Sequence, residues 1–320
     1  MTCFVPLQAV RVESSVNPIR ILGKNYPGDP TKLAGYLQLP CGKCVGCRLD
    51  YSRCWCIRNV HESQLHEYNS FVTLTYNDQY LPTSGSLDYR HFTLFIKRLR
   101  SAIDRKYSDY AFLSNRVSNL RFYMCGEYGA QTFRPHYHAL FFNLDFADKV
   151  KHSVRNGFTL YTSDTLSSFW TDPDTGESMG YAVVGSLTIK SCAYVSRYVV
   201  KKALDGYQPI YFNKETGEFL QLEKTNMSRR PGIAFEWFKE YSKSVYPDDK
   251  VVMGNGMIFK PPRYYDVQLE KVDPLVYESI KQSRTLFSES SKAKANSTID
   301  RLIVREKIQL KRLDQLPRIL

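Results

Sequence analysis

The chain has no long apolar run. No uninterrupted hydrophobic stretch approaches the roughly 20 residues that a membrane-spanning helix needs. Residues 1–6 lack the basic segment followed by an apolar one that marks a secretory signal. Internal repeats, long linkers and low-complexity tracts are also missing from the sequence. These absences argue against a membrane, secreted or repeat protein, and we expect a cytosolic one.

Acidic residues are outnumbered by basic ones. The 320 residues include 44 Lys and Arg against 32 Asp and Glu, which gives a formal net charge of +12. A basic chain favours a polyanionic partner such as nucleic acid, although a solvated basic surface explains the same balance. The chain is also rich in rings, with 23 Tyr and 18 Phe, and such rings can stack on bases. Composition alone does not decide between these interpretations, so the motifs must.

The middle of the chain alternates strand and helix patterns. β-Branched and aromatic runs predict strands at 71–76, 120–125, 136–144, 158–161 and 181–185. Apolar residues at three- and four-residue steps predict helices from about 89 to 103 and from 191 to 203. Gly and Pro between 128 and 135 predict that the second and third strands form a hairpin. Beyond 206 we expect a hairpin around 213–217 and two more helices, the last near the C-terminus.

His136 and His138 form a His-x-His pair on the third predicted strand. Residues two apart on a strand share a face, so both imidazoles project to one side and Tyr137 to the other. If the hairpin closes, Glu127 on the incoming strand lies roughly opposite His136 and supplies a third ligand. Two imidazoles and a carboxylate suit Mg²⁺, Mn²⁺ or a similar ion and leave coordination positions open. The alternative is a pair of ordinary polar histidines on a half-exposed sheet.

Tyr194 and Tyr198 are four residues apart on a predicted helix, which places them on one face, one turn apart. The pKa of a free phenol is about 10, so roughly one tyrosine in a thousand is ionised at neutral pH. Nucleophilic attack by tyrosine therefore needs stabilising charge, which a metal ion or the nearby Lys201 and Lys202 could provide. The alternative is an aromatic helix face packed into the core.

Three cysteines, Cys41, Cys44 and Cys47, have the spacing C-x2-C-x2-C. In a reducing compartment such a group indicates metal ligands or thiols rather than disulfides, and thiolates at this spacing commonly bind zinc. We favour Cys3 as the fourth ligand, which would tie the N-terminus to the core, although the sequence does not separate Cys3 from Cys54. An iron–sulfur cluster and free thiols are the alternatives.

Together these motifs resemble those of the HUH endonucleases, specifically the rolling-circle replication initiators. The strand at 71–76, Pro-His-Tyr-His at 135–138 and the tyrosine segment at 194–202 match the three family motifs. They also match their order, since relaxases place the tyrosine near the N-terminus. The chain is more similar still to initiators of the gokushovirus branch of the Microviridae, which are small single-stranded DNA phages. This resemblance covers most of the chain through further blocks at 40–48, 124–129, 191–194 and 227–232.

The resemblance implies an α+β fold in which a central antiparallel β-sheet is flanked by helices. It implies a Cys-rich, zinc-binding N-terminal segment (1–65), an endonuclease core (66–205) and a partly helical, basic C-terminal region (206–320). Glu127 is the third metal ligand by analogy with other initiators, and Gln131 is a substitute. The chain departs from the general pattern at Tyr137, where other members have a bulky hydrophobe; an aromatic ring turned away from the metal should serve.

The mechanism implied by the resemblance is two transesterifications on single-stranded origin DNA. One tyrosine attacks a phosphodiester, which leaves a 3′-hydroxyl for the host DNA polymerase and a 5′-phosphotyrosyl link. The second tyrosine later cuts the regenerated origin, and the freed 3′-hydroxyl closes the circle. Joining requires no ATP because each new bond replaces one broken, and the sequence has no Gly-x4-Gly-Lys-Ser/Thr loop to bind it. Unwinding would fall to a host helicase in the bacterial cytoplasm.

Two other functions fit parts of this pattern. A zinc-containing, sequence-specific DNA-binding regulator would use the HUH-like residues only as structure. A transposase-type HUH nuclease would use the same metal group, commonly with a single tyrosine. Formation of a covalent protein–DNA adduct separates the enzymes from the regulator.

Overall fold

The fold is described from a computed structural model. It describes residues 3–12, 18–23, 26–104, 111–112, 120–129, 131–155, 157–204, 212, 217–254 and 256–315. Side chains of 104, 111–112 and 198–204 lie outside the description. The chain divides into two compact units, one formed by Met1–Ser52, Val199–Tyr207 and Glu278–Arg318, the other by Arg53–Tyr198, Gln208–Tyr277 and Ile319–Leu320.

An antiparallel sheet of seven strands forms the centre of the larger unit, in the order β12-β6-β7-β4-β11-β10-β9. The predicted strands and the hairpin are present within one to three residues of their expected bounds. The strands are β4 (Asn69–Thr75), β6 (Arg121–Tyr128), β7 (Pro135–Phe142), β9 (Val150–Arg155), β10 (Phe158–Thr162), β11 (Ala182–Ser186) and β12 (Thr225–Met227).

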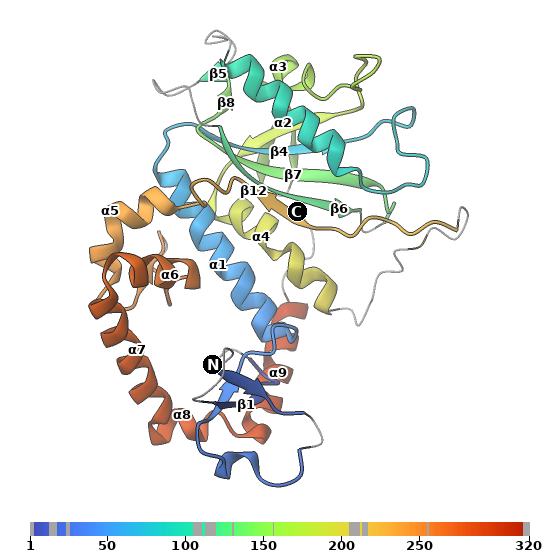
Figure 1. Cartoon of the computed structure of the whole chain (residues 1–320). Helices are drawn as coiled ribbons and strands as arrows, with labels where there is room; N and C mark the ends of the chain where they lie inside the picture. The colour runs from blue at the N-terminus through green and yellow to red at the C-terminus, as the bar shows by residue number, and fades with distance from the viewer. Residues whose placement is uncertain are drawn as a thin grey trace. The chain divides into compact units, whose positions relative to one another are not determined.

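One face of this sheet packs against helix α2 (Tyr89–Asp104), which Figure 1 shows lying across the strands. Alternate residues of the central strands, among them Val72, Leu74 and Tyr137, are buried on this side. The predicted apolar face of the helix supplies the facing layer, consisting of Phe92, Phe95, Ile96, Leu99 and Ile103. This side is therefore a dry core, and the short helix α3 (Asp164–Ser167) adds Leu166 to it.

The opposite face carries the other half of each strand and is covered by α4 (Ile189–Leu204) and the later turns of α1 (Val45–Gln64). The two helices contact each other through Asn59, whose side-chain amide donates to the Ser196 hydroxyl at 3.2 Å. Trp55 packs against Tyr123 of β6, with ring centroids 4.9 Å apart. The expected arrangement, with a tyrosine-bearing helix over the histidine side of the sheet, is confirmed.

In the smaller unit, three short strands form a separate antiparallel sheet in the order β2-β1-β3. They are β1 (Leu7–Arg11), β2 (Ile19–Ile21) and β3 (Tyr36–Leu39), with a 3-10 turn, η1, at Pro30–Lys32. β1 pairs with β3 so that Leu7 faces Leu39, which brings the chain before β1 next to the chain after β3. Two further strand pairs, β5 (Ala111–Phe112) with β8 (Asp145–Phe146) and β13 (Val251–Val252) with β14 (Ile258–Phe259), belong to the larger unit.

The C-terminal part of the chain is mainly helical, as expected, but it contains more helices than the two predicted. They are α5 (Phe235–Val245), α6 (Arg263–Val272), α7 (Pro274–Glu289), α8 (Ser291–Ala295) and α9 (Ile299–Asp314). Pro274 starts α7, and the Ser290 hydroxyl caps α8, so these residues divide a region whose apolar pattern is nearly continuous. The hairpin expected around 213–217 lies largely outside the described residues, although Phe212 and Phe219 form an antiparallel bridge.

None of the helices that the structure describes combines the length and the apolar character that a bilayer crossing requires.

Candidate functional site

Glu127, His136 and His138 meet on the helix-covered face at the centre of the sheet. The β6–β7 register pairs Glu127 with His136, and the residue two positions along β7 is His138. The Nε2 atoms of both histidines lie 3.1 Å from Glu127 Oε1. Glu127 and His138 are buried, and His136 is partly buried. The hairpin therefore converts two separate sequence motifs into one compact group.

The outer ring nitrogens of the two histidines are held by the protein. His136 Nδ1 lies 3.1 Å from the Arg134 carbonyl oxygen, which can only accept, so this nitrogen donates. His138 Nδ1 lies 2.9 Å from the Thr73 hydroxyl on β4. Partners at Nδ1 fix the ring orientation and leave Nε2 as the nitrogen turned toward Glu127.

The spacing of these atoms fits a small divalent cation. Ligands on adjacent corners of an octahedral Mg²⁺ site, with bonds of 2.0–2.1 Å, are about 3 Å apart. The two Glu127–histidine distances of 3.1 Å match this value. One carboxylate and two imidazoles occupy only three of six corners, which leaves room for oxygen atoms of a substrate or water. Gln131, the substitute ligand considered above, lies exposed in the hairpin turn.

Tyr194 of α4 reaches this group directly. Its hydroxyl donates to Glu127 Oε1 at 2.9 Å and lies 3.2 Å from His138 Nε2. The ring is held by aromatic contacts, edge-on to His138 at 5.1 Å between centroids and edge-on to Phe71 of β4 at 6.3 Å. The tyrosine oxygen thus stands at the same point as the three candidate ligand atoms.

The surroundings of Tyr194 keep its hydroxyl protonated. Burial raises the pKa of this phenol far above its usual value, and the Glu127 carboxylate raises it further, while Arg197 one turn along α4 acts in the opposite direction. A positive charge bound by Glu127 and the histidines would reverse the largest electrostatic contribution. The hydroxyl is therefore positioned to become a nucleophile only when the group holds a cation.

The other residues predicted on this helix are not placed in detail. The backbones of Tyr198, Lys201 and Lys202 belong to α4, but their side chains lie outside the described residues. Their roles stay predictions. Val195, between the two tyrosines, is fully buried.

Three further residues border the group, and sequence reasoning gave none of them a role. Phe71 and Thr73 follow each other on one face of β4 and contact His138, with Phe71 stacked on its ring at 5.5 Å. Their alternation on a strand next to the histidines was a usable signal. Glu223 accepts from the Tyr128 backbone N–H at 2.7 Å, and burial together with the Glu127 charge raises its pKa to about 8. No sequence signal could place Glu223, because it precedes a three-residue strand far along the chain.

Four cysteines form a second group, in the smaller unit. The Sγ atoms of Cys3, Cys41, Cys44 and Cys47 all lie within 4.8 Å of one another, and the structure thus selects Cys3 rather than Cys54 as the fourth thiol. Cys3 is fully buried and the other three are partly buried. Burial raises the pKa of Cys44, but hydrogen bonds from the Phe4 amide and from neighbouring cysteines outweigh it and lower the pKa to about 7.

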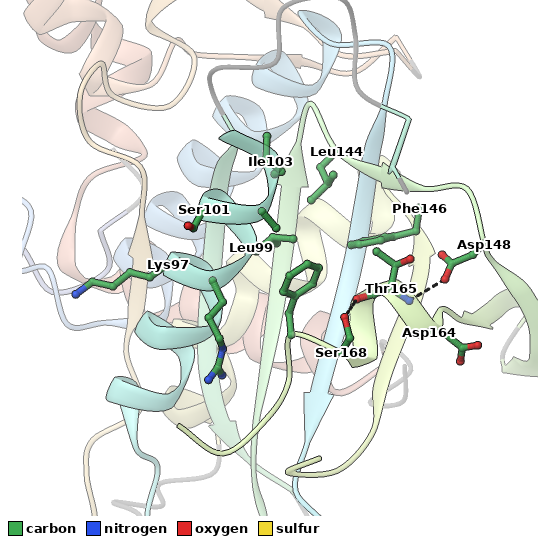
Figure 2. A pocket seen from close by; sticks show the side chains of 13 residues that line it. Lys97, Leu99, Ser101, Ile103, Leu144, Phe146, Asp148, Asp164, Thr165 and Ser168 are labelled. Carbon is green, nitrogen blue, oxygen red and sulfur yellow. Dashed lines mark hydrogen bonds between the residues drawn. The ribbon is translucent and has the colours of Figure 1, made fainter. Parts of the chain in front are cut away.

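A cavity of about 850 Å³ lies on the α2 side of the sheet, away from the Glu127 group. Figure 2 shows it between α2, Leu144, Phe146 and the α3 region, where the Thr165 backbone N–H donates to Asp148 at 2.7 Å. Its lining is mostly apolar and includes none of the candidate ligands. The chemistry-bearing residues of the sheet are therefore on the other face from this cavity.

Comparison with known proteins gives the same direction as the geometry. Residues 69–203 match a family model of replication-associated proteins of the ORF2 type. The replication-associated protein VP4 of Bdellovibrio phage phiMH2K is 36% identical over 274 residues, which cover 81% of this chain and 78% of that protein. The replication-associated protein ORF2 of Spiroplasma virus 4 is 33% identical over 303 residues, covering 89% and 86%.

A more distant relative is the replication-associated protein ORF4 of Chlamydia phage 1, 29% identical over 244 residues, which cover 73% of this chain and 54% of that protein. No solved structure matches the chain. The Glu127, His136 and His138 group and Tyr194 all fall within the segment matched by the family model. On these matches the chain belongs to the family of replication-associated proteins of Microviridae-like phages.

Proposed function

We propose that the protein initiates rolling-circle replication by nicking single-stranded origin DNA through Tyr194, with a divalent cation held by Glu127, His136 and His138. One observation carries this proposal: the Tyr194 hydroxyl lies 2.9 Å from Glu127 Oε1 and 3.2 Å from His138 Nε2. A tyrosine packed only for structure has no need to share its oxygen with two candidate metal ligands.

The chain's own residues would prepare the nucleophile and hold the substrate. Glu127 accepts the Tyr194 proton in a hydrogen bond and aims the phenol oxygen at the open side of the group. Thr73 and the Arg134 carbonyl keep both imidazoles oriented. A bound Mg²⁺ or Mn²⁺ would supply positive charge that polarises the scissile phosphate and offsets the Glu127 carboxylate.

The reaction is a transesterification with balanced bonds. The Tyr194 oxygen forms a bond to phosphorus as the bond from phosphorus to the 3′-oxygen breaks, and the departing 3′-oxygen takes up a proton. The products are a 5′-phosphotyrosyl link and a free 3′-hydroxyl, which a host polymerase can extend. Reversal of the same step by a new 3′-hydroxyl joins DNA ends without ATP.

Tyr198 is proposed as the second nucleophile, one helical turn from Tyr194, with Lys201 and Lys202 supplying positive charge to the phenolate or the leaving group. A second tyrosine would let one protein cut the regenerated origin while the first link persists. Unwinding is assigned to a host helicase in the infected cell.

The test is covalent capture of DNA. The wild-type chain, Tyr194→Phe, Tyr198→Phe and the double variant would be incubated with single-stranded origin DNA and Mn²⁺ and then resolved in detergent. We expect an adduct with the wild type and with Tyr198→Phe, and a loss of about 10³-fold or more in first-cleavage rate with Tyr194→Phe, as expected when the nucleophile is removed.

Tyr181→Phe is the matched control, because this tyrosine is 71% exposed. An adduct formed equally well by the double variant would eliminate both tyrosines as nucleophiles. Absence of any wild-type adduct at any origin sequence would favour the DNA-binding regulator. A transposase-type nuclease would show the Tyr194 dependence but no contribution of Tyr198 to strand joining.

A further inference from the structure

We infer that Cys3, Cys41, Cys44 and Cys47 form a four-thiolate site for one structural Zn²⁺, separate from the Glu127 group and independent of the nicking reaction. The first support is geometric. Two thiolates on a tetrahedral zinc with bonds of about 2.3 Å stand about 3.8 Å apart. In the structure Cys44 Sγ and Cys3 Sγ are 3.8 Å apart, and Cys41 Sγ and Cys47 Sγ are 4.0 Å apart.

The site is assembled by the small β-sheet. Because β1 and β3 pair with Leu7 facing Leu39, Cys3 before one strand and Cys41 after the other arrive at the same end of the sheet. The turn after Cys41 then brings in Cys44 and Cys47, the latter in the first turn of α1. The four ligands thus come from two segments that are distant in the sequence, and a bound ion would cross-link them.

Backbone amides surround the sulfurs in the way that thiolates need. The N–H of Phe4 donates to Cys44 Sγ at 3.3 Å, and the N–H of Cys41 donates to Cys3 Sγ at 3.3 Å. Cys41 Sγ accepts from the backbone N–H groups of Lys43 and Cys44 at 3.4 and 3.3 Å. Such donors disperse the negative charge of four sulfurs, and the N-terminus of α1 adds its positive dipole end.

The loop that carries the central ligands is also fixed from outside. Arg48 Nε donates to the Lys43 carbonyl at 2.8 Å, which closes the turn between Cys41 and Cys47. The Arg305 guanidinium of α9 lies 5.9 Å from the centre of the Phe4 ring, beside the residue whose amide contacts Cys44. These contacts hold the ligands from the protein side.

The arrangement selects one ion over other uses of cysteine. Each cysteine of a four-iron cluster binds a different iron, so its sulfurs are spread around a larger core than four atoms mutually within 4.8 Å. The eight cysteines of the chain are thiols in this structure. Four sulfur ligands fill a tetrahedral zinc and leave no position for substrate, which is the mark of a structural rather than a catalytic site.

Metal content of the purified full-length chain tests the inference. We expect about one zinc per wild-type chain after dialysis against a mild chelator. Cys44→Ser should lower zinc at least tenfold. Cys54→Ser, which removes a thiol outside the group, should retain it, and His136→Ala should retain it too because it touches only the other group. Zinc that persists in Cys44→Ser, or that disappears in His136→Ala, would overturn the assignment.

A measurement on the wild type covers the case in which Cys44→Ser does not fold. Cobalt exchanged into the chain should give the intense visible bands of tetrahedral Co²⁺–thiolate, and a mercurial titration should release the metal as these bands vanish. Weak octahedral bands, or iron with a broad visible absorption in the untreated protein, would contradict a zinc thiolate site. Neither result depends on nicking, so failure here leaves the proposed function untouched.

Discussion

The two clusters of potential ligands in this chain differ in every respect that matters to metal chemistry. The Glu127 group lies on adjacent strands, combines oxygen with nitrogen, occupies half of an octahedron and has a tyrosine at its open side. The cysteine group comes from loops and a helix start, consists only of sulfur and is complete with four ligands. A rigid sheet suits an exchangeable site for reaction, whereas a cross-link between distant segments suits a permanent one.

The largest expected effect comes from breaking the open site. In His138→Ala, loss of a buried ligand should lower the Mn²⁺-dependent nicking rate by on the order of 10³-fold, which corresponds to about 4 kcal/mol of charge stabilisation. His152→Ala, at an exposed position of β9, should nick at the wild-type rate. Single-turnover cleavage assays measure both. A His138→Ala rate within threefold of wild type would remove the metal from the mechanism.

The closed site should respond to chelators differently from the open one. EDTA should abolish nicking at once, with full recovery on adding Mn²⁺ and no change in melting temperature. Removal of zinc with a mercurial and a strong chelator should lower the melting temperature by many degrees, since structural zinc binding contributes directly to folding. Scanning calorimetry beside the nicking assay follows both. Loss of activity and of thermal stability at one common chelator concentration would contradict two separate sites.

A smaller effect should follow from loosening one ligand of the open site without removing it. Thr73→Val keeps the shape but deletes the hydroxyl that holds His138 Nδ1. Loss of such a partner typically costs 10–100-fold in metal affinity or activity. Thr75→Val, on the same strand, deletes a hydroxyl that bonds the Tyr181 carbonyl instead. Mn²⁺ affinity measured by calorimetry should fall for Thr73→Val alone; equal affinities would leave Thr73 as packing only.

The smallest effect concerns acid stability without metal. His61 is buried in the larger unit, where it contacts the Tyr265 hydroxyl at 2.7 Å and stacks on Trp237. Burial lowers its pKa to about 3, so the unfolded chain binds this proton at a higher pH than the folded chain does. Stability should therefore be lost as pH falls from about 6.5 to about 3, by about 1.4 kcal/mol per pH unit from this group.

Urea unfolding of the chelated protein measures this slope, with His61→Gln as comparison. The variant should be less stable near pH 7, because it loses the ring stacking, yet flatter below pH 6. Parallel pH profiles for both proteins would show that His61 is already protonated in the folded state.

The parts of the fold that the sequence predicted share one property: their signal is local. Alternation in the strands at 71–76 and 136–144, the turn residues between 128 and 135, and the two-residue spacing of His136 and His138 are all read within a few residues. The hairpin then fixed the place of Glu127, because antiparallel register follows from the turn. The tyrosine helix was predicted by its four-residue step.

What the sequence could not supply depends on contacts between distant segments. The choice of Cys3 over Cys54 follows from the pairing of β1 with β3, and neither strand was predicted in the N-terminal segment. Glu223 reaches the site through a short edge strand whose pairing with β6 has no local pattern. The division of the C-terminal region into five helices depends on caps and prolines within a continuous apolar pattern.

The central claim is that the Tyr194 oxygen, placed beside Glu127 and His138, is the atom that first attacks DNA. Mass spectrometry of the peptide that remains linked to DNA after a single turnover with Mn²⁺ tests this directly. We predict a nucleotide remnant on Tyr194 in the wild type and in Tyr198→Phe. A remnant found only on Tyr198, or on a residue outside α4, would contradict the account.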